Sequence, residues 1–247
     1  MQYNYTAGQN NGRVAQTVDA VLGETVNYTY DMWNRLSTAT ATNGNWGDSY
    51  TYDNFGNLTG KTPTVGSAPS MNVPANLATN QPTGMGSYDA NGDPVPLNST
   101  GAPIYVWDVE NRLITNQPTT ATPVNYSYDP WGRRIWKEVP GYQGSATTGE
   151  IYFYGVTGQK METYSFSIGN SFSASLEGIN VYFGKKLLQS KGAWVVTDKL
   201  GTVRANASLG AMNYFPYGEG RTSTANGVEK FGTYTRDGIG QDYAEQR

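Results

Sequence analysis

The sequence predicts an all-β protein built from repeated β-hairpins, and three observations support this class. First, one phrase recurs four times: an aromatic residue, any residue, an aromatic residue, Asp and a short turn. Second, turn and strand formers are abundant, with 30 Gly and 19 Tyr among 247 residues. Third, no long stretch places apolar residues at helical spacing. A phrase that recurs in this way indicates an array of one supersecondary unit. The four copies begin at Tyr28, Tyr50, Tyr105 and Tyr126.

The two aromatic residues of each copy lie two positions apart, so in a strand they point to the same face. Aromatic side chains favour strands because they pack well across a pleated surface. We therefore expect the rings to pack against one another as one continuous cross-strand ladder. The alternative is that the rings bind sugars by stacking on their apolar faces. The predicted ladder consists of Tyr28, Tyr30, Tyr50, Tyr52, Tyr105, Trp107, Tyr126 and Tyr128.

An Asp ends each strand, because its short carboxylate can accept a hydrogen bond from the backbone N–H two residues on. The third residue after each Asp is Asn or Gly, which tolerate a positive φ best. The combination predicts a type I turn closed by a left-handed residue. Where Arg follows, we expect an ion pair or ring stacking with a neighbouring hairpin, with a ligand-binding stripe as the alternative. The predicted turn residues are Asp31, Asn34, Arg35, Asp53, Gly56, Asp108, Asn111, Arg112, Asp129, Gly132 and Arg133.

The pattern divides the chain into four predicted segments. Hairpins occupy residues 1–60 and 105–190, a Pro-rich insert with a degenerate copy at Tyr88 occupies 61–104, and a different set of motifs fills 191–247. Seven of the 12 prolines fall in the insert. Proline removes a donor from the strand ladder, so loops or edge strands are expected there. Because the chain opens within a degenerate copy at Tyr3, we expect a piece of a longer protein or a processed product.

The composition excludes several kinds of chemistry. The chain has no His and no Cys, which excludes Ser-His-Asp and Cys-His catalysis, disulfides and His- or Cys-ligated zinc. A net charge of −3 gives no electrostatic case for a nucleic-acid partner. No apolar run is long enough for membrane insertion. Asp89 and Asp93 resemble half of a calcium loop, but the Glu that such a loop requires is missing. No metal and no cofactor are therefore expected.

The repeated phrase and three later motifs resemble the RHS or YD-repeat family, found in bacterial polymorphic toxins, insecticidal toxin complexes and animal teneurins. The later motifs, at residues 198–204, 214–219 and 231–243, are similar to the RHS-associated core that follows the repeats. The resemblance implies a β-sheet strip that spirals into a hollow shell or barrel around a C-terminal toxin domain. It also implies export, so an extracellular or cell-surface location is expected, although residues 1–20 show no signal peptide.

The resemblance implies one chemical site as well. In the family, an Arg-Asp pair acts in self-cleavage with a second Asp in a downstream D-P-x-G phrase. The pair matches Arg236 and Asp237, and no such phrase follows it in this chain. A carboxylate without a second one has no proton-sharing partner, so a structural role is expected and no enzyme activity.

The predicted function is therefore structural: a shell segment that pairs with neighbouring repeat segments or with further copies of itself. Three alternatives stay open. They are a self-assembling filament or surface appendage, an adhesin that binds carbohydrate through exposed aromatic rings, and the remnant of a self-cleaving aspartyl protease.

Overall fold

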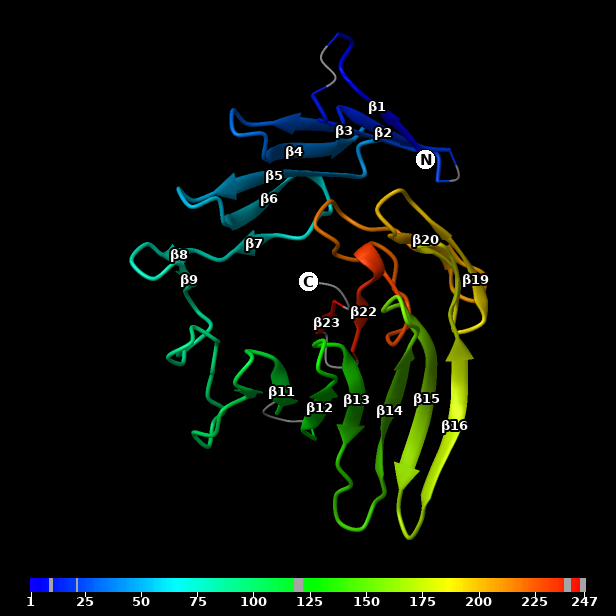
Figure 1. Cartoon of the computed structure of the whole chain (residues 1–247). Coiled ribbons are helices and arrows are strands. Elements are labelled where there is room, and N and C mark those ends of the chain that lie inside the picture. Colours follow the sequence, from blue (N-terminus) through cyan, green and yellow to red (C-terminus); the bar gives the residue numbers. More distant parts are fainter. Residues whose placement is uncertain (9–10, 21, 118–121, 238–240, 245–247) are drawn as a thin grey trace. The chain divides into compact units, whose positions relative to one another are not determined.

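The computed structural model describes residues 1–8, 11–20, 22–117, 122–237 and 241–244, and over these ranges the chain is all-β (Figure 1). Every strand pair in these ranges is antiparallel. The one helical element there is η1, a 3-10 turn over Phe231–Thr233, and no helix has the length and apolarity of a membrane span. The predicted all-β class is confirmed.

The chain forms two compact units. The first comprises Met1–Gly84 together with Phe215–Glu219, and the second comprises Met85–Tyr214 and the described residues that follow Glu219. In the first unit, seven strands form one sheet in which each strand pairs with the next along the chain. These strands are β1 (Gln2–Asn4), β2 (Gln16–Asp19), β3 (Glu24–Tyr30), β4 (Leu36–Ala41), β5 (Trp46–Tyr52), β6 (Leu58–Gly66) and β7 (Met71–Asn72). A separate pair follows, β8 (Ala75–Asn76) and β9 (Gln81–Pro82).

The core of the first unit lies on one face of β3, β4 and β5. Trp46 and Tyr50 are 3% and 6% exposed, and Phe215 packs against them from far along the chain. The rings of Trp46 and Phe215 meet edge to face, with centroids 5.1 Å apart. Tyr217 makes a similar contact with Tyr50 at 5.2 Å. Aromatic pairs in this geometry add stabilisation beyond the area that they bury.

The second unit contains a seven-stranded sheet, a five-stranded sheet and a short pair, again with neighbours in chain order. The seven strands are β10 (Tyr105–Trp107), β11 (Leu113–Asn116), β12 (Val124–Tyr128), β13 (Arg134–Val139), β14 (Thr147–Tyr154), β15 (Lys160–Ile168) and β16 (Phe172–Ile179). The five are β17 (Val181–Phe183), β18 (Lys186–Ser190), β19 (Ala193–Thr197), β20 (Val203–Asn206) and β21 (Gly210–Ala211). The short pair is β22 (Thr235–Arg236) and β23 (Asp242–Tyr243).

The predicted single continuous ladder is wrong, because the hairpins belong to separate sheets. In the described residues between β7 and β10, pairing is limited to β8 with β9 and to two isolated bridges, Tyr88 with Pro94 and Leu97 with Pro103. The prolines of the insert explain the break, since each removes an N–H that a continuous ladder would need.

Candidate functional site

The Asp of each repeat binds three N–H groups of its own turn. In the first copy, Oδ1 of Asp31 accepts bonds from the backbone N–H groups of Trp33 and Arg35, both at 2.9 Å. Its Oδ2 accepts a bond from Nε of Arg35 at 2.7 Å. In the second copy, the side-chain amide of Asn57 replaces the guanidinium. The two backbone contacts recur at Asp53, Asp108 and Asp129.

The residue that closes each turn is left-handed. Its φ is 66° at Asn34, 89° at Gly56, 59° at Asn111 and 79° at Gly132. Burial alone would raise the pKa of Asp108, but the backbone and guanidinium N–H groups of Arg112 outweigh it and hold the pKa below its usual value. These carboxylates stay ionised and hold the turn, which is the geometry of a structural cap.

In the three copies that have an Arg in the turn, this Arg also contacts the next hairpin along the chain. The Arg35 guanidinium lies 4.5 Å from the ring centroid of Tyr52 and donates to the carbonyl of Asp53 at 3.3 Å. Arg112 makes the same two contacts, with Tyr128 at 5.2 Å and the Asp129 carbonyl at 3.3 Å. The Arg133 guanidinium lies 4.9 Å from the ring of Tyr154. The predicted stacking between neighbouring hairpins is therefore present.

The second aromatic residue of each copy completes the link in the opposite direction. The hydroxyl of Tyr52 donates to the carbonyl of Leu36, the residue after Arg35, at 2.7 Å. Equivalent bonds run from Tyr30 to Val14, from Tyr128 to Leu113, from Tyr154 to Arg134 and, through the indole N–H, from Trp107 to Pro94. The first copy is thus fastened to the second, and the third to the fourth, by a ring, a guanidinium and a phenol.

The first aromatic residues take more varied positions. The hydroxyl of Tyr28 lies 3.1 Å from Oγ1 of Thr17, and Tyr50 belongs to the core of the first unit. Tyr105 packs against Trp107 with ring centroids 6.4 Å apart. Tyr126 is 5% exposed and reaches toward Asp237. These rings are therefore mostly packed against protein rather than presented to a ligand.

Replacing Arg112 with Met tests the link between repeats. We expect the variant to lower the free energy of unfolding of the second unit, because the hydrogen bonds to Asp108 and Asp129 and the ring contact with Tyr128 are lost together. Lys185→Met, at an exposed lysine, is the matched control and should change stability by less than about 0.5 kcal/mol. Urea denaturation measures both, and equal stabilities would contradict the link.

Arg236 and Asp237 follow one another in the chain, but their side chains serve different partners. Arg236 binds Asp242 in a two-bond pair, at 2.7 and 2.8 Å, near the surface. Asp237 points inward and is 2% exposed. It accepts bonds from Arg134 at 2.7 and 3.3 Å and lies 3.2 Å from Nζ of Lys137. Residues 238–240 of the third core-like motif lie outside the described residues.

A second carboxylate joins this cluster through Lys137. Oε2 of Glu150 lies 3.0 Å from Nζ of Lys137 and accepts a bond from the hydroxyl of Tyr152 at 2.6 Å. Burial alone would raise the pKa of Glu150, but Lys137, Tyr152 and Lys191 outweigh it and lower the pKa to about 2. The guanidinium of Arg134 is flanked by the rings of Tyr126, Tyr152 and Tyr243, at 5.1, 5.2 and 4.1 Å.

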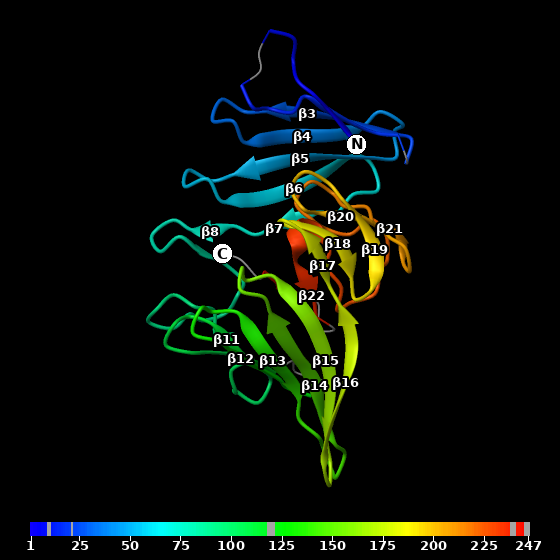
Figure 2. The same ribbon diagram turned by 45° about the vertical axis from the view of Figure 1, so that its right-hand side comes forward.

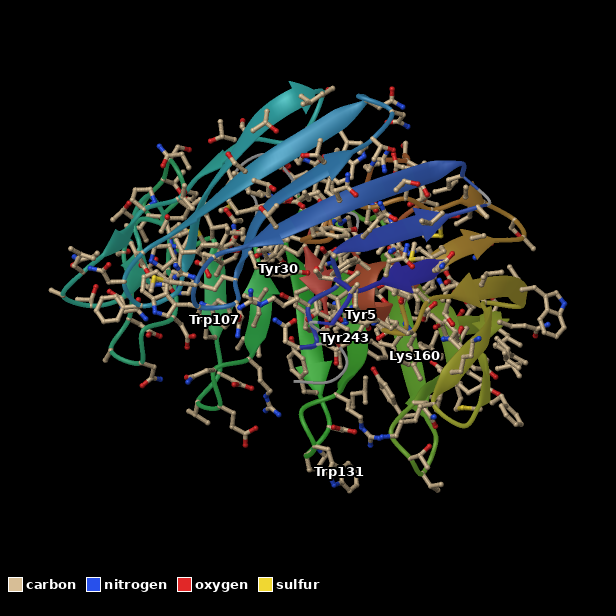
Figure 3. The ribbon with its side chains drawn as sticks, turned by 90° about the horizontal axis from the view of Figure 1, so that it is seen from above. Tyr5, Tyr30, Trp107, Trp131, Lys160 and Tyr243 are labelled. Atoms are coloured by element: carbon tan, nitrogen blue, oxygen red, sulfur yellow. The ribbon has the colours of Figure 1, made fainter. Side chains whose placement is uncertain are left out.

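A further buried ion pair lies in the same unit. Nζ of Lys160 is 2.8 Å from Oε1 of Glu229, and the two side chains are 3% and 2% exposed. Asn180 donates to the same carboxylate at 2.9 Å, and the Ser190 hydroxyl bonds its other oxygen. Burial would raise the pKa of Glu229, but Lys160 and these hydrogen bonds lower it to about 2. Figure 3 shows Lys160 among the strands rather than at a turn.

Beside Asp237 lies a cleft of about 1330 Å³, within the second unit. Repeat residues line it, including Trp107, Tyr128, Trp131 and Arg133, and so does Tyr243 of β23. Trp131 is 78% exposed, and Figure 3 shows its ring at the tip of the turn, pointing away from the ribbon. Both oxygens of Asp237 lie close to cations, those of Arg134 and Lys137. The carboxylate that borders the cleft is therefore already paired.

The first unit also contains a buried carboxylate, and this one has no hydrogen-bond partner in the described part of the chain. Asp48 of β5 is fully buried, and neither of its oxygens finds a donor there. Its nearby cation, Lys61, is itself paired with Glu219. Burial raises the pKa of Asp48, and attraction to Lys61 opposes that rise only in part. A buried charge in this state costs stability.

Replacing Asp48 with Asn is expected to stabilise the first unit by about 1 kcal/mol at pH 7, because it removes the buried charge and keeps the shape. The sign of the pH dependence follows from the raised pKa. The wild-type protein loses stability as the pH rises above the unfolded value of 3.8, so the advantage of the variant should shrink toward zero below about pH 4. Thermal denaturation of both proteins from pH 3.5 to 8 measures it, and an advantage that grows with acid would contradict it.

Sequence reasoning missed the buried cations and their carboxylates, but one signal was available. In three copies, the residue after the basic or amide position is apolar: Leu36, Leu58 and Leu113. In the fourth it is Arg134, a charge at a position that otherwise faces the interior. Asp198 was also missed as a turn cap. It accepts bonds from the N–H groups of Leu200 and Thr202, so the repeat turn recurs within the core-like region.

One family model and several solved structures match this chain. Residues 10–45 match the family model described as RHS Repeat. The chain is similar to the crystal structure of TcdB2-TccC3-TEV, with a TM-score of 0.55 and 17% identity, over 89% of this chain and 13% of that one. A crystal structure of TcdB2-TccC3 matches with a TM-score of 0.40 and 12% identity, over 90% of this chain and 17% of that one. No curated protein matches.

The chain therefore spans only a small part of either crystal structure, and the first likeness shows a shared fold. The turn of the first copy, with its aspartate cap and left-handed Asn34, falls inside the matched residues. The same turn recurs at Asp53, Asp108 and Asp129. Residues 10–45 thus match the RHS repeat that the sequence predicts, and the same turn geometry recurs in the later copies.

Proposed function

We propose that the chain is a wall segment of an RHS-type shell that encloses or presents a C-terminal effector, outside the cell or at its surface. The observation that carries the proposal is the link between successive repeats. Because ring, guanidinium and phenol contacts recur from one hairpin to the next, the unit that they build is extended by adding further repeats.

Two further observations support a structural role without catalysis. The aspartates of the repeats are held by their own turns, and Asp237 is held by Arg134 and Lys137. The chain resembles in fold a part of the TcdB2-TccC3-TEV structure, of which it spans 13%. A segment of that relative size would need neighbouring repeat segments to complete a wall.

The enclosing role is tested with a small folded reporter carrying a protease site in its linker. The reporter is fused to the C-terminus in one protein and to the N-terminus in a matched control. If the chain shields a domain attached to its C-terminus, the C-terminal linker should be cut more slowly than the N-terminal one. Micrographs of the same samples should show thin curved sheets, and equal cutting rates together with featureless particles would contradict the proposal.

Carbohydrate binding is a second candidate, favoured by Trp131 alone. Its ring is exposed and borders the cleft, and flat aromatic faces can stack on sugars. A glycan array should then give signals that Trp131→Ala abolishes while Trp194→Ala, at another exposed ring, keeps them. An array without signals removes this candidate.

A further inference from the structure

The seven-stranded sheet of the second unit ends in a long strand with an open edge. β16 has eight residues, whereas the other end strands of the three larger sheets, β1, β7, β10, β17 and β21, have two or three. Figures 1 and 2 both show β16 on the outer side of β15. In the described residues, one backbone bond reaches β16 from outside its pairing with β15, from Gly192 to the carbonyl of Ile179. The edge before Ile179 is a template for another strand.

This edge lacks the features that usually prevent strand addition. Residues 172–177 are all exposed, and none of them is Lys or Pro. The single charge among them is Glu177, which pairs with Lys191 of the same chain. Phe172 and Leu176 are 56% and 48% exposed, and they share a face because they are four residues apart. Short strands, lysines and prolines protect most natural edges, so an open edge of this length indicates a partner.

We propose that β16 pairs antiparallel with β16 of a second copy of this chain, about a two-fold axis at Ala174. A two-fold axis perpendicular to the sheet keeps each face on its own side, so opposed residues must share a face. With the axis at Ala174, Phe172 of each copy lies opposite Leu176 of the other, and Ser173 lies opposite Ser175. Glu177 lies opposite Ser171 rather than opposite itself.

The occupant is a second copy because the strand is complementary to itself in this register. Apolar side chains meet each other twice, hydroxyl groups meet hydroxyl groups, and the smallest side chain lies on the axis. No like charges face each other, and cross-strand pairs of these kinds are favourable. The pairing does not rest on the proposed wall role, since a homotypic contact at β16 requires no cargo.

Single cysteines test the register, because the chain contains no native Cys that could compete. Directly opposed Cβ atoms lie roughly 4.5–5.5 Å apart, which is close to the span of a disulfide. Ala174→Cys should therefore form a covalent dimer on mild oxidation. Val196→Cys, at an exposed position of β19, is the matched control and should stay monomeric.

A mixed sample makes the test sharper. Phe172→Cys and Leu176→Cys should crosslink to each other when combined, and neither should crosslink alone, since two copies of Phe172 would be roughly 13 Å apart. Equal crosslinking at Val196, or crosslinks without this register, would overturn the proposal.

Self-association without crosslinks gives an independent readout. Sedimentation should show a dimer that Ala174→Lys weakens about tenfold or more, because two lysines would face each other at the axis. Ala174 is exposed in the single chain, so the lysine should leave the fold intact, which circular dichroism checks. A wild-type chain that stays monomeric at its highest soluble concentration overturns the pairing. Such a result would leave the reporter experiment on the wall role unaffected.

Discussion

Replacing Asp237 with Ala is expected to lower the free energy of unfolding of the second unit by about 3–5 kcal/mol. The reason is the environment of Arg134, whose side chain is 3% exposed and depends on this carboxylate. Removal of Asp237 leaves a guanidinium in the interior with three aromatic rings but without its counter-charge. Breaking a buried pair costs far more than the pair contributes net, because the remaining charge is not solvated.

The matched control is Asp242→Ala, five residues further on. Asp242 pairs with Arg236, but these side chains are 37% and 32% exposed, so water screens the pair and its loss should cost less than about 1 kcal/mol. Hydrogen exchange at the amides of β12 to β15, followed in urea, assigns the loss to the second unit. If both variants lose the same stability, the buried pair has no special structural role.

The outcome also bears on the self-cleavage that the family resemblance implies. The side chains of Arg236 and Asp237 contact different partners, Asp242 and Arg134. The carboxylate of Asp237 also lies 3.2 Å from Lys137, so both of its oxygens contact cations. A large stability loss for Asp237→Ala would identify the residue as a structural anchor of β22.

The repeat turns could be predicted from the sequence because every contact in them is local. The Asp31 carboxylate and its donors at Trp33 and Arg35 lie within five consecutive residues. A left-handed Asn34 follows from residue type alone. Short-range chemistry of this kind survives any arrangement of the rest of the chain, so the hairpins and the all-β class could be derived from it.

The buried charges could not be predicted in the same way, because their partners are distant in the sequence. Arg134 meets Asp237, and Lys61 meets Glu219, only after the chain has folded. A strand pattern predicts that a position faces inward, but it does not predict which residue of opposite charge will pair with the side chain at that position. The break between the two seven-stranded sheets could be predicted only in part. The prolines of residues 61–104 predicted weak strand pairing there, and the structure shows that the two sheets are separate.

Glu229→Gln is expected to destabilise the second unit by about 3–5 kcal/mol at pH 7, because it removes the charge of a buried carboxylate that lies 2.8 Å from the buried ammonium of Lys160. The glutamine keeps the shape of the side chain and can still bond Asn180 and Ser190, so the charge is the main change. A rescue is expected from the double variant Glu229→Gln with Lys160→Met. This variant removes both charges and should recover much of the loss, since apolar replacement of a whole buried pair is often neutral.

The pH dependence separates this charge effect from simple misfolding. The pKa of Glu229 is about 2 in the folded chain, against 4.5 for the ordinary group, so its contribution to stability is complete above pH 4.5. It is lost as the pH falls from 4.5 toward 2, by roughly 3 kcal/mol in total. The stability difference between wild type and Glu229→Gln should therefore shrink over that window, and urea titrations at several pH values measure it. A difference that stays constant from pH 7 to pH 3 would show that Glu229 acts through its shape and not through its charge.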